Sequence, residues 1–125
     1  MLYDTDVLIW ALRGNTRAAK AIDDEELLEI SAVSYMELIK GARNKKDLRL
    51  TKAFLGDLGF CIVPLSENIG HRAAIYLEEY GLKSGLGVPD ALIAATAVET
   101  DAVLCTGNAR DYKSVAEMRL KLFRP

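Results

Sequence analysis

Four acidic residues follow apolar runs of this sequence that alternate with helical patterns. Asp4 ends the first apolar run, and Glu37 lies one helical turn into the helix that follows the second. Asp90 opens a helix after a glycine-rich segment, and Asp111 follows the apolar run that ends at Cys105. If the runs are parallel strands, all four acids fall on the edge of the sheet where α/β proteins bind ligands.

Carboxylates gathered without lysine or arginine partners repel one another, and proteins usually neutralise such a cluster with a bound cation. Hard oxygen ligands suit Mg²⁺ or Mn²⁺, which bind through one or two carboxylates and keep waters for a substrate phosphate. Such an ion can activate water and stabilise charge at an attacked phosphodiester. These residues therefore predict metal-assisted phosphate chemistry.

Each acid also has a purely structural interpretation. Asp4 fits a cap for the helix that follows it. The run Ser34-Tyr35-Met36-Glu37 fits a capping box, in which Glu37 reaches back to the amide of Ser34. Asp90, which follows Pro89, fits an acid placed at the positive end of a helix dipole.

Histidine and cysteine offer no competing chemistry. The one histidine, His71, lies in a helical pattern without an evident triad partner, which favours a surface or packing role. Cys61 and Cys105 lie inside apolar runs and are predicted to be buried free thiols. No Cys/His spacing indicates zinc.

The pattern predicts an α/β fold, a mostly parallel five-stranded sheet with helices on both faces, in a single domain over residues 1–125. Residues 81–88 are predicted to be a flexible loop, and no repeat or linker interrupts the chain. Strands are predicted at 1–3, 27–32, 60–65, 102–105 and 120–123, helices at 6–13, 16–22, 34–42, 46–58, 67–80 and 90–100, and a helical turn at 109–115.

Composition is that of an ordinary globular protein, with 50% hydrophobic and 27% charged residues and a net charge of −2. No signal-peptide or membrane-spanning pattern is present, so a cytoplasmic location is expected. The basic stretch, residues 40–52, has two interpretations: a solvated helix face or a patch that binds RNA phosphates. Its candidate RNA-binding residues are Arg43, Lys45, Lys46 and Arg49.

Four blocks of the sequence resemble the motifs of PIN-domain nucleases, in the family's order and over nearly the whole chain. They are residues 2–9 (LYDTDVLI), 31–42 (SAVSYMELIKGA), 89–97 (PDALIAATA) and 103–108 (VLCTGN) followed by Asp111 and Tyr112. The short chain and the run MELIKGA are most similar to VapC-type toxins of type II toxin–antitoxin pairs.

The resemblance implies a five-stranded parallel sheet, Mg²⁺- or Mn²⁺-dependent endoribonuclease activity, frequent homodimers and inhibition by a cognate antitoxin. By position it implies Asp4 and Asp90 as principal metal ligands and Glu37 as the third acid. The sequence departs from the family at Asp6, where asparagine is usual. Asn108 and Asp111 both remain candidates to complete the site, with Asp111 favoured and Thr106 as a possible accessory hydroxyl.

Two other functions fit parts of the sequence. The run Asp4-Thr5-Asp6-Val7-Leu8 resembles the DxDxV signature of haloacid-dehalogenase phosphatases, in which Asp4 would be the nucleophile and Asp6 the general acid. Thr106, however, follows Asp90 and leaves little chain for that superfamily's later motifs. A non-catalytic PIN-like module that binds RNA or protein is the second alternative, and a divalent-metal titration would distinguish it.

Overall fold

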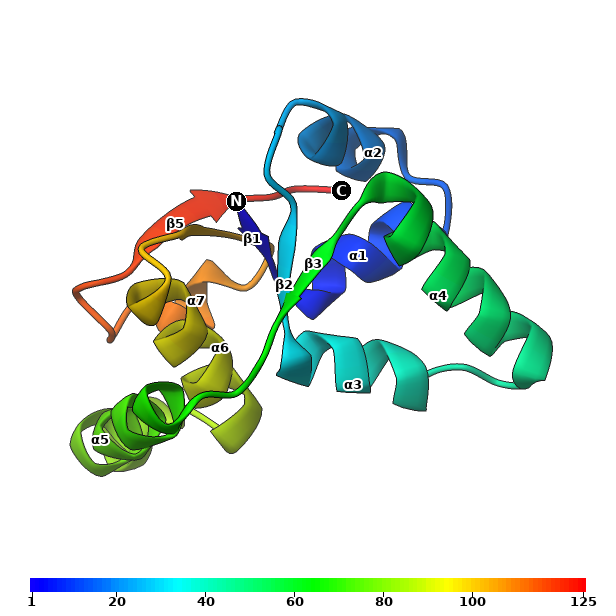
Figure 1. The fold of residues 1–125 in the computed structure, drawn as a ribbon. Helices are drawn as coiled ribbons and strands as arrows, with labels where there is room; N and C mark the ends of the chain where they lie inside the picture. Colours follow the sequence, from blue (N-terminus) through cyan, green and yellow to red (C-terminus); the bar gives the residue numbers. More distant parts are fainter.

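The computed structural model describes residues 1–125, which form five strands and seven helices (Figure 1). The strands are β1 (Leu2–Tyr3), β2 (Glu29–Ser31), β3 (Cys61–Val63), β4 (Val103–Thr106) and β5 (Arg119–Leu122). The helices are α1 (Thr5–Leu12), α2 (Thr16–Asp23), α3 (Ala32–Lys40), α4 (Lys45–Leu58), α5 (Glu67–Ser84), α6 (Val88–Glu99) and α7 (Ala109–Tyr112).

The strands form one sheet in the order β3-β2-β1-β4-β5, and every neighbouring pair is parallel. The predicted five-stranded α/β architecture is therefore confirmed. From β1 the chain builds outward through β2 and β3, then crosses to β4 and β5 on the other side. The carboxyl ends of β1 and β4 consequently flank the point where strand order reverses, which is where open α/β sheets bind ligands.

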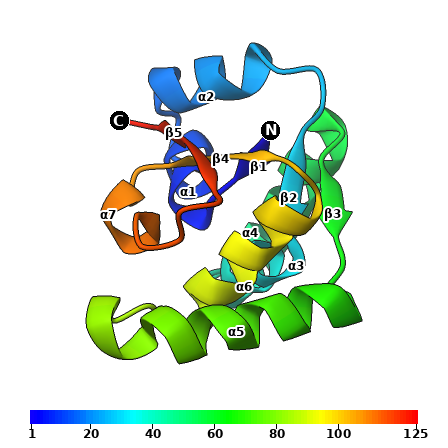
Figure 2. The ribbon, with the colours of Figure 1, turned by 90° about the vertical axis from the view of Figure 1, so that its left-hand side faces the viewer.

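The short central strand β1 separates two apolar layers because successive side chains of a strand face opposite sides of the sheet. Leu2 packs into a cluster with residues of α5 and α6, whereas Tyr3 packs with residues of α1 and α2. Figures 1 and 2 show α5 and α6 together on one side of the sheet and α1 and α4 on the other. None of the helices is both long and apolar enough to span a membrane.

The segment predicted to be a loop at 81–88 is helical at both ends, so that prediction is right only for residues 85–87. Helix α5 continues through Gly81 to Ser84, whose hydroxyl donates to the carbonyl of Tyr80. The helix ends at Gly85, which has a φ of 70°. Helices commonly end at a residue in the left-handed backbone conformation, which glycine adopts without a steric penalty.

The prediction for the cysteines is half right. Both thiols are free and Cys105 is buried, but Cys61 is exposed. β3 is an edge strand of the sheet, which leaves Cys61 and Ile62 open to solvent. The apolar run around Cys61 carried no signal that its strand would lie at an edge.

Candidate functional site

Asp4 is a buried carboxylate at the end of the central strand, with only 5% of its surface exposed. Its Oδ1 accepts a hydrogen bond from the amide of Thr5 at 2.8 Å. Its Oδ2 accepts two, from Thr106 Oγ1 at 2.7 Å and from the Tyr112 hydroxyl at 3.1 Å. Burial raises the pKa of Asp4 to about 6 despite these bonds, and the charge of Asp6 adds to the rise. Asp4 also caps α1, so its structural interpretation is confirmed, and its functional interpretation stays a prediction.

Tyr112 joins Asp4 to Asp90. It is 1% exposed, and its hydroxyl oxygen lies 3.1 Å from Asp4 Oδ2 and 3.4 Å from Asp90 Oδ1. Burial and the two carboxylate charges raise the pKa of Tyr112, so the hydroxyl keeps its proton. A tyrosine hydroxyl has one proton to donate, so it cannot donate to both carboxylates at once.

Asp90 lies in the first turn of α6, whose N-cap residue Gly87 makes no side-chain capping bond. The positive end of the helix dipole favours its negative charge there. Burial nevertheless raises the pKa of Asp90, and the charges of Asp111 and Glu37 raise it further. The charges of two of the other three predicted acids, Asp111 and Glu37, therefore act on Asp90.

The capping-box interpretation of Glu37 is wrong. Helix α3 begins at Ala32, and its cap is Ser31, whose hydroxyl accepts from the amide of Val33. Glu37 Oε1 instead accepts a 2.7 Å hydrogen bond from Thr5 Oγ1, which also lies 3.0 Å from Ser34 Oγ. The exposed Glu37 carboxylate is therefore oriented by the residue that follows Asp4.

Asp6 fixes the segment that follows β4. Its Oδ1 accepts from the amide of Val7 at 2.8 Å and its Oδ2 from the amide of Gly107 at 2.9 Å. The asparagine usual at this position has one acceptor oxygen, so it could not repeat both bonds with its side chain unchanged. A Cβ at position 107 would lie 2.5 Å from Asp6 Oδ2, so this close approach requires glycine.

Asp111 and Asn108 differ in their relation to the site. The charge of Asp111 contributes to the raised pKa values of Asp6 and Asp90. Asn108 is exposed, its side chain makes no capping bond, and its amide donates to Thr106 Oγ1 at 2.9 Å. Asp111 is exposed as well, so the choice between Asp111 and Asn108 stays a prediction.

The donor set suits a hard divalent cation held by few protein ligands. None of the five acids of this site, Asp4, Asp6, Glu37, Asp90 and Asp111, forms an ion pair with a lysine or arginine. No three His, Cys, Asp or Glu side chains surround a common point. A site built on the Asp4 and Asp90 carboxylates, with water completing the shell, fits both observations, because Mg²⁺ commonly binds through one or two carboxylates.

Sequence reasoning missed the roles of Tyr112 and Thr5. Both occur in the motif blocks, but no spacing rule indicates that their hydroxyls contact Asp4, Asp90 or Glu37. A tyrosine beside an acid near the predicted site was the only available signal for Tyr112.

The sequence matches the PIN domain family over residues 1–118. The chain belongs to the PIN domain family. This membership favours the PIN interpretation of the Asp4-Thr5-Asp6 run over the phosphatase signature. Among curated proteins, no sequence matches the chain.

Solved structures share the PIN fold of this chain. A chain of a toxin–antitoxin complex from Klebsiella pneumoniae is 30% identical, with a TM-score of 0.79 and coverage of 94% of this chain and 93% of that one. VapBC-1 from nontypeable Haemophilus influenzae is 23% identical, with a TM-score of 0.82 and 98% coverage of both chains. VapBC2 from Rickettsia felis, bound to a promoter DNA fragment, is 21% identical, with a TM-score of 0.83 and coverage of 99% and 100%.

The raised pKa of Asp4 predicts that the metal-free protein loses stability as pH rises from about 4 to about 6. The folded state holds the Asp4 proton more tightly than the unfolded state, whose pKa is near 3.8, so folding binds protons in this window. Two pKa units correspond to about 3 kcal/mol at most. Urea unfolding in EDTA should therefore show that the free energy of unfolding of Asp4→Asn, relative to that of wild type, is higher at pH 7 than at pH 4.

Asp47→Asn is the matched control with the opposite sign. Its hydrogen bonds with Arg43 lower the pKa of Asp47, so wild type gains stability over that variant as pH rises. A difference between Asp4→Asn and wild type that stays constant with pH would contradict the electrostatic account of Asp4.

Proposed function

We propose that this PIN-domain protein is a Mg²⁺- or Mn²⁺-dependent endoribonuclease and the toxin of a toxin–antitoxin pair. One observation carries the nuclease proposal: Asp4 and Asp90 meet at a single tyrosine hydroxyl where strand order reverses, with no basic partner. Asp4 is buried and Asp90 is half-buried, and carboxylates removed from water without a basic partner are costly and typical of functional sites.

Asp4 and Asp90 are the proposed cation ligands. Glu37, oriented by Thr5, and Asp111, close to Asp90, are the further catalytic acids, placed to orient water or the cation's hydration shell. The bound cation would activate water and neutralise charge developing on the phosphodiester. Asp6 and Thr106 hold the segments that carry these groups, through the Gly107 amide and the Asp4 carboxylate.

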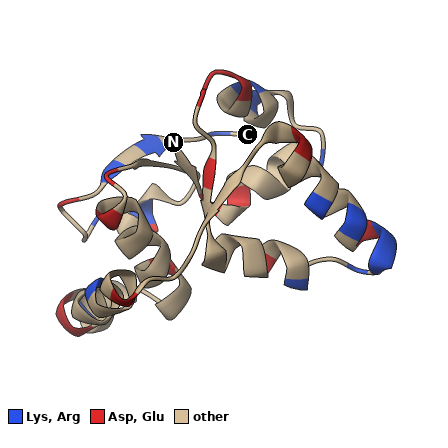
Figure 3. Cartoon of the chain, viewed as in Figure 1, with Lys and Arg blue, Asp and Glu red and all other residues tan.

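Part of the basic stretch is suited to bind RNA phosphates. Lys45, Lys46 and Arg49 lie exposed on α4 and make no ion pair, and Figure 3 shows basic residues gathered on this helix. Arg43 differs because its Nε binds Asp47 Oδ2 at 2.9 Å, which neutralises part of its charge. The first three are therefore the proposed phosphate contacts, with Arg43 secondary.

The proposed antitoxin contact is a cavity of about 580 Å³ between α1, α3 and α4. Among the apolar residues of α1 and α3, Ile9, Leu12 and Leu38 line this cavity, whereas Val7 is buried in the core and Trp10 and Ile39 do not line it. The lining residues are Ile9, Leu12, Arg13, Glu37, Leu38, Gly41, Ala42, Arg43, Asp47, Leu50 and Thr51.

An amphipathic helix can cover the apolar part of this cavity, and an arginine beside it can reach Glu37 and the acids behind it. The 30% identical Klebsiella chain comes from a toxin–antitoxin complex, which supports an antitoxin as a partner of this chain. A second copy of the chain is the other proposed partner, and exposed Met36, Ile75 and Val88 are available for that contact.

Asp4→Asn and Asp90→Asn should each abolish Mn²⁺-dependent RNA cleavage while the fold is retained. Loss of one group that stabilises transition-state charge costs about 100-fold or more. Cleavage of defined structured RNAs, with and without Mn²⁺, measures this, with Asp23→Asn on α2 as the exposed control. Near wild-type cleavage by either site variant would refute the assignment. A wild-type protein that binds RNA without cutting it would favour the non-catalytic alternative.

The triple variant Lys45→Gln/Lys46→Gln/Arg49→Gln should bind RNA more weakly and with a flatter salt dependence. Each lost contact to a single strand removes about 0.7 from the slope of log K against log salt, so the triple variant loses about 2. RNA binding is titrated against salt in the Asp4→Asn background, so that the RNA is not cleaved, and this measures the slope of log K against log salt. Arg17→Gln/Lys20→Gln on α2 is the control, and an equal loss of slope there would show that the effect is not local to α4.

Leu50→Gln should weaken binding of the co-expressed partner about tenfold or more, because Leu50 is 56% exposed within the cavity and its burial would stabilise the complex. Leu82→Gln, on the remote face of α5, is the control. The partner is identified by co-purification from the native operon, and the added partner should suppress cleavage. A bound partner that leaves cleavage unchanged would contradict the toxin proposal.

A further inference from the structure

The Tyr112 hydroxyl is the group through which Asp4 and Asp90 are joined. We propose that Tyr112 is a positioning residue that orients the Asp4 carboxylate as a one-oxygen ligand and so sets the affinity of the site for a divalent cation. The inference rests on the proposed function in one respect, because it takes Asp4 and Asp90 as cation ligands.

The hydrogen bonds of the Asp4 carboxylate limit how many of its lone pairs can bind a cation. Each carboxylate oxygen has two lone pairs. Thr106 and Tyr112 take both of those on Oδ2, and the Thr5 amide takes one on Oδ1. One lone pair, on Oδ1, is left for a cation. Asp4 is therefore built to bind through a single oxygen.

Three separate segments hold the plane of this carboxylate. Thr5 begins α1, Thr106 ends β4 and Tyr112 ends α7, so no single helix determines its orientation. Tyr112 is the only one of the three that also contacts Asp90. It therefore relates the two carboxylates to each other, in addition to orienting Asp4.

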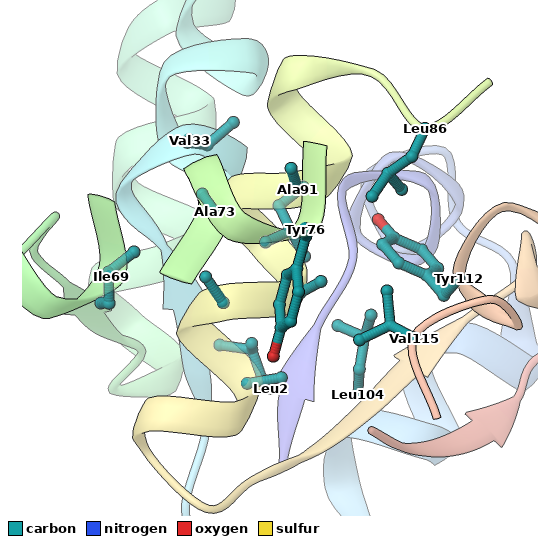
Figure 4. Close-up of a cluster of buried hydrophobic side chains, with 14 residues drawn as sticks. Leu2, Val33, Ile69, Ala73, Tyr76, Leu86, Ala91, Leu104, Tyr112 and Val115 are labelled. Carbon is teal, nitrogen blue, oxygen red and sulfur yellow. The ribbon is translucent and has the colours of Figure 1, made fainter. Parts of the chain in front are cut away.

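Packing fixes the position of the tyrosine ring. Tyr112 belongs to the buried cluster that includes Leu86, Leu104 and Val115, and Figure 4 shows its ring close to Leu86 and Val115. Helix α7 has only four residues, so the ring's neighbours rather than the helix hold it in place. A phenylalanine would fill the same space. Burying the hydroxyl has a cost that a hydrogen bond must offset, and the bond that it donates to Asp4 provides this.

The test compares Tyr112→Phe with Tyr3→Phe by calorimetric titration with Mn²⁺. Tyr3 is an equally buried tyrosine whose hydroxyl donates to the Ala21 carbonyl at 2.7 Å, away from Asp4 and Asp90. Loss of a hydrogen bond to a ligand typically weakens metal affinity by about 10- to 100-fold. Tyr112→Phe should show this increase in the Mn²⁺ dissociation constant, and Tyr3→Phe should match wild type.

Thr106→Val removes the other donor to Asp4 Oδ2 and should raise the Mn²⁺ dissociation constant in the same way, which provides a second measurement if Tyr112→Phe fails to fold. In cleavage assays the Tyr112→Phe protein should need more Mn²⁺ for half-maximal rate, with a maximal rate close to wild type. A purely structural role would not separate these two quantities.

Three results would overturn the inference: a Mn²⁺ dissociation constant of Tyr112→Phe within twofold of wild type, an equal loss in Tyr3→Phe, or no Mn²⁺ binding by wild type. The last result would remove the metal assignment as well. Wild type that binds Mn²⁺ but leaves RNA intact would refute the nuclease proposal alone, and the comparison of dissociation constants would still decide the role of Tyr112.

Discussion

The strongest constraint on the site is the burial of one carboxylate, that of Asp4, at the end of the central strand. Both residues of β1 are completely buried, and the amide of Asp4 continues the pairing with β4 through a 2.9 Å bond to the Cys105 carbonyl. The side chain is thereby fixed in a place poor in water. An ionised group there must be compensated by hydrogen bonds or by a cation, since neither lysine nor arginine reaches it.

The compensation comes from residues far away in the sequence. Thr106 and Tyr112 are 102 and 108 positions from Asp4, and they reach it only because β4 lies beside β1 in the sheet. The same crossover places α6, which carries Asp90, above that edge. Strand order therefore determines the chemistry of the site, because another order would separate Asp4 from both hydroxyls and from Asp90.

Sequence patterns identified what repeats along the chain and missed what depends on single contacts. Strand alternation and helical spacing predicted the elements and the acids at their ends, because those signals are summed over many residues. The cap of α3 was placed at Ser34 rather than Ser31, since both serines precede apolar helical positions. The sequence predicts the end of this helix at Tyr80, before Gly81, but α5 ends at Ser84, before Gly85, because glycine content does not reveal which glycine adopts a positive φ.

Such patterns could not predict the contacts of the Tyr112 hydroxyl, for a different reason. Its ring has the spacing of an ordinary core residue, and only the tertiary structure shows which polar atoms its tip meets. Cys61 is the corresponding case at the surface: its run is apolar, but its strand lies at the sheet edge. Both show that composition predicts burial of a segment better than the environment of one atom.

The acidic site and the basic helix place opposite demands on an RNA strand in the proposed function. Basic residues of α4 attract its phosphates, whereas each bare carboxylate near Asp4 repels them, by about 4 kcal/mol for unit charges 4 Å apart at a surface. Cation binding removes that repulsion, so RNA and cation must strengthen each other's binding by the same factor. A site with two principal carboxylates and no third acid at a common point suits this coupling. It can hold the cation modestly in the free protein and more tightly when a phosphate oxygen completes the shell.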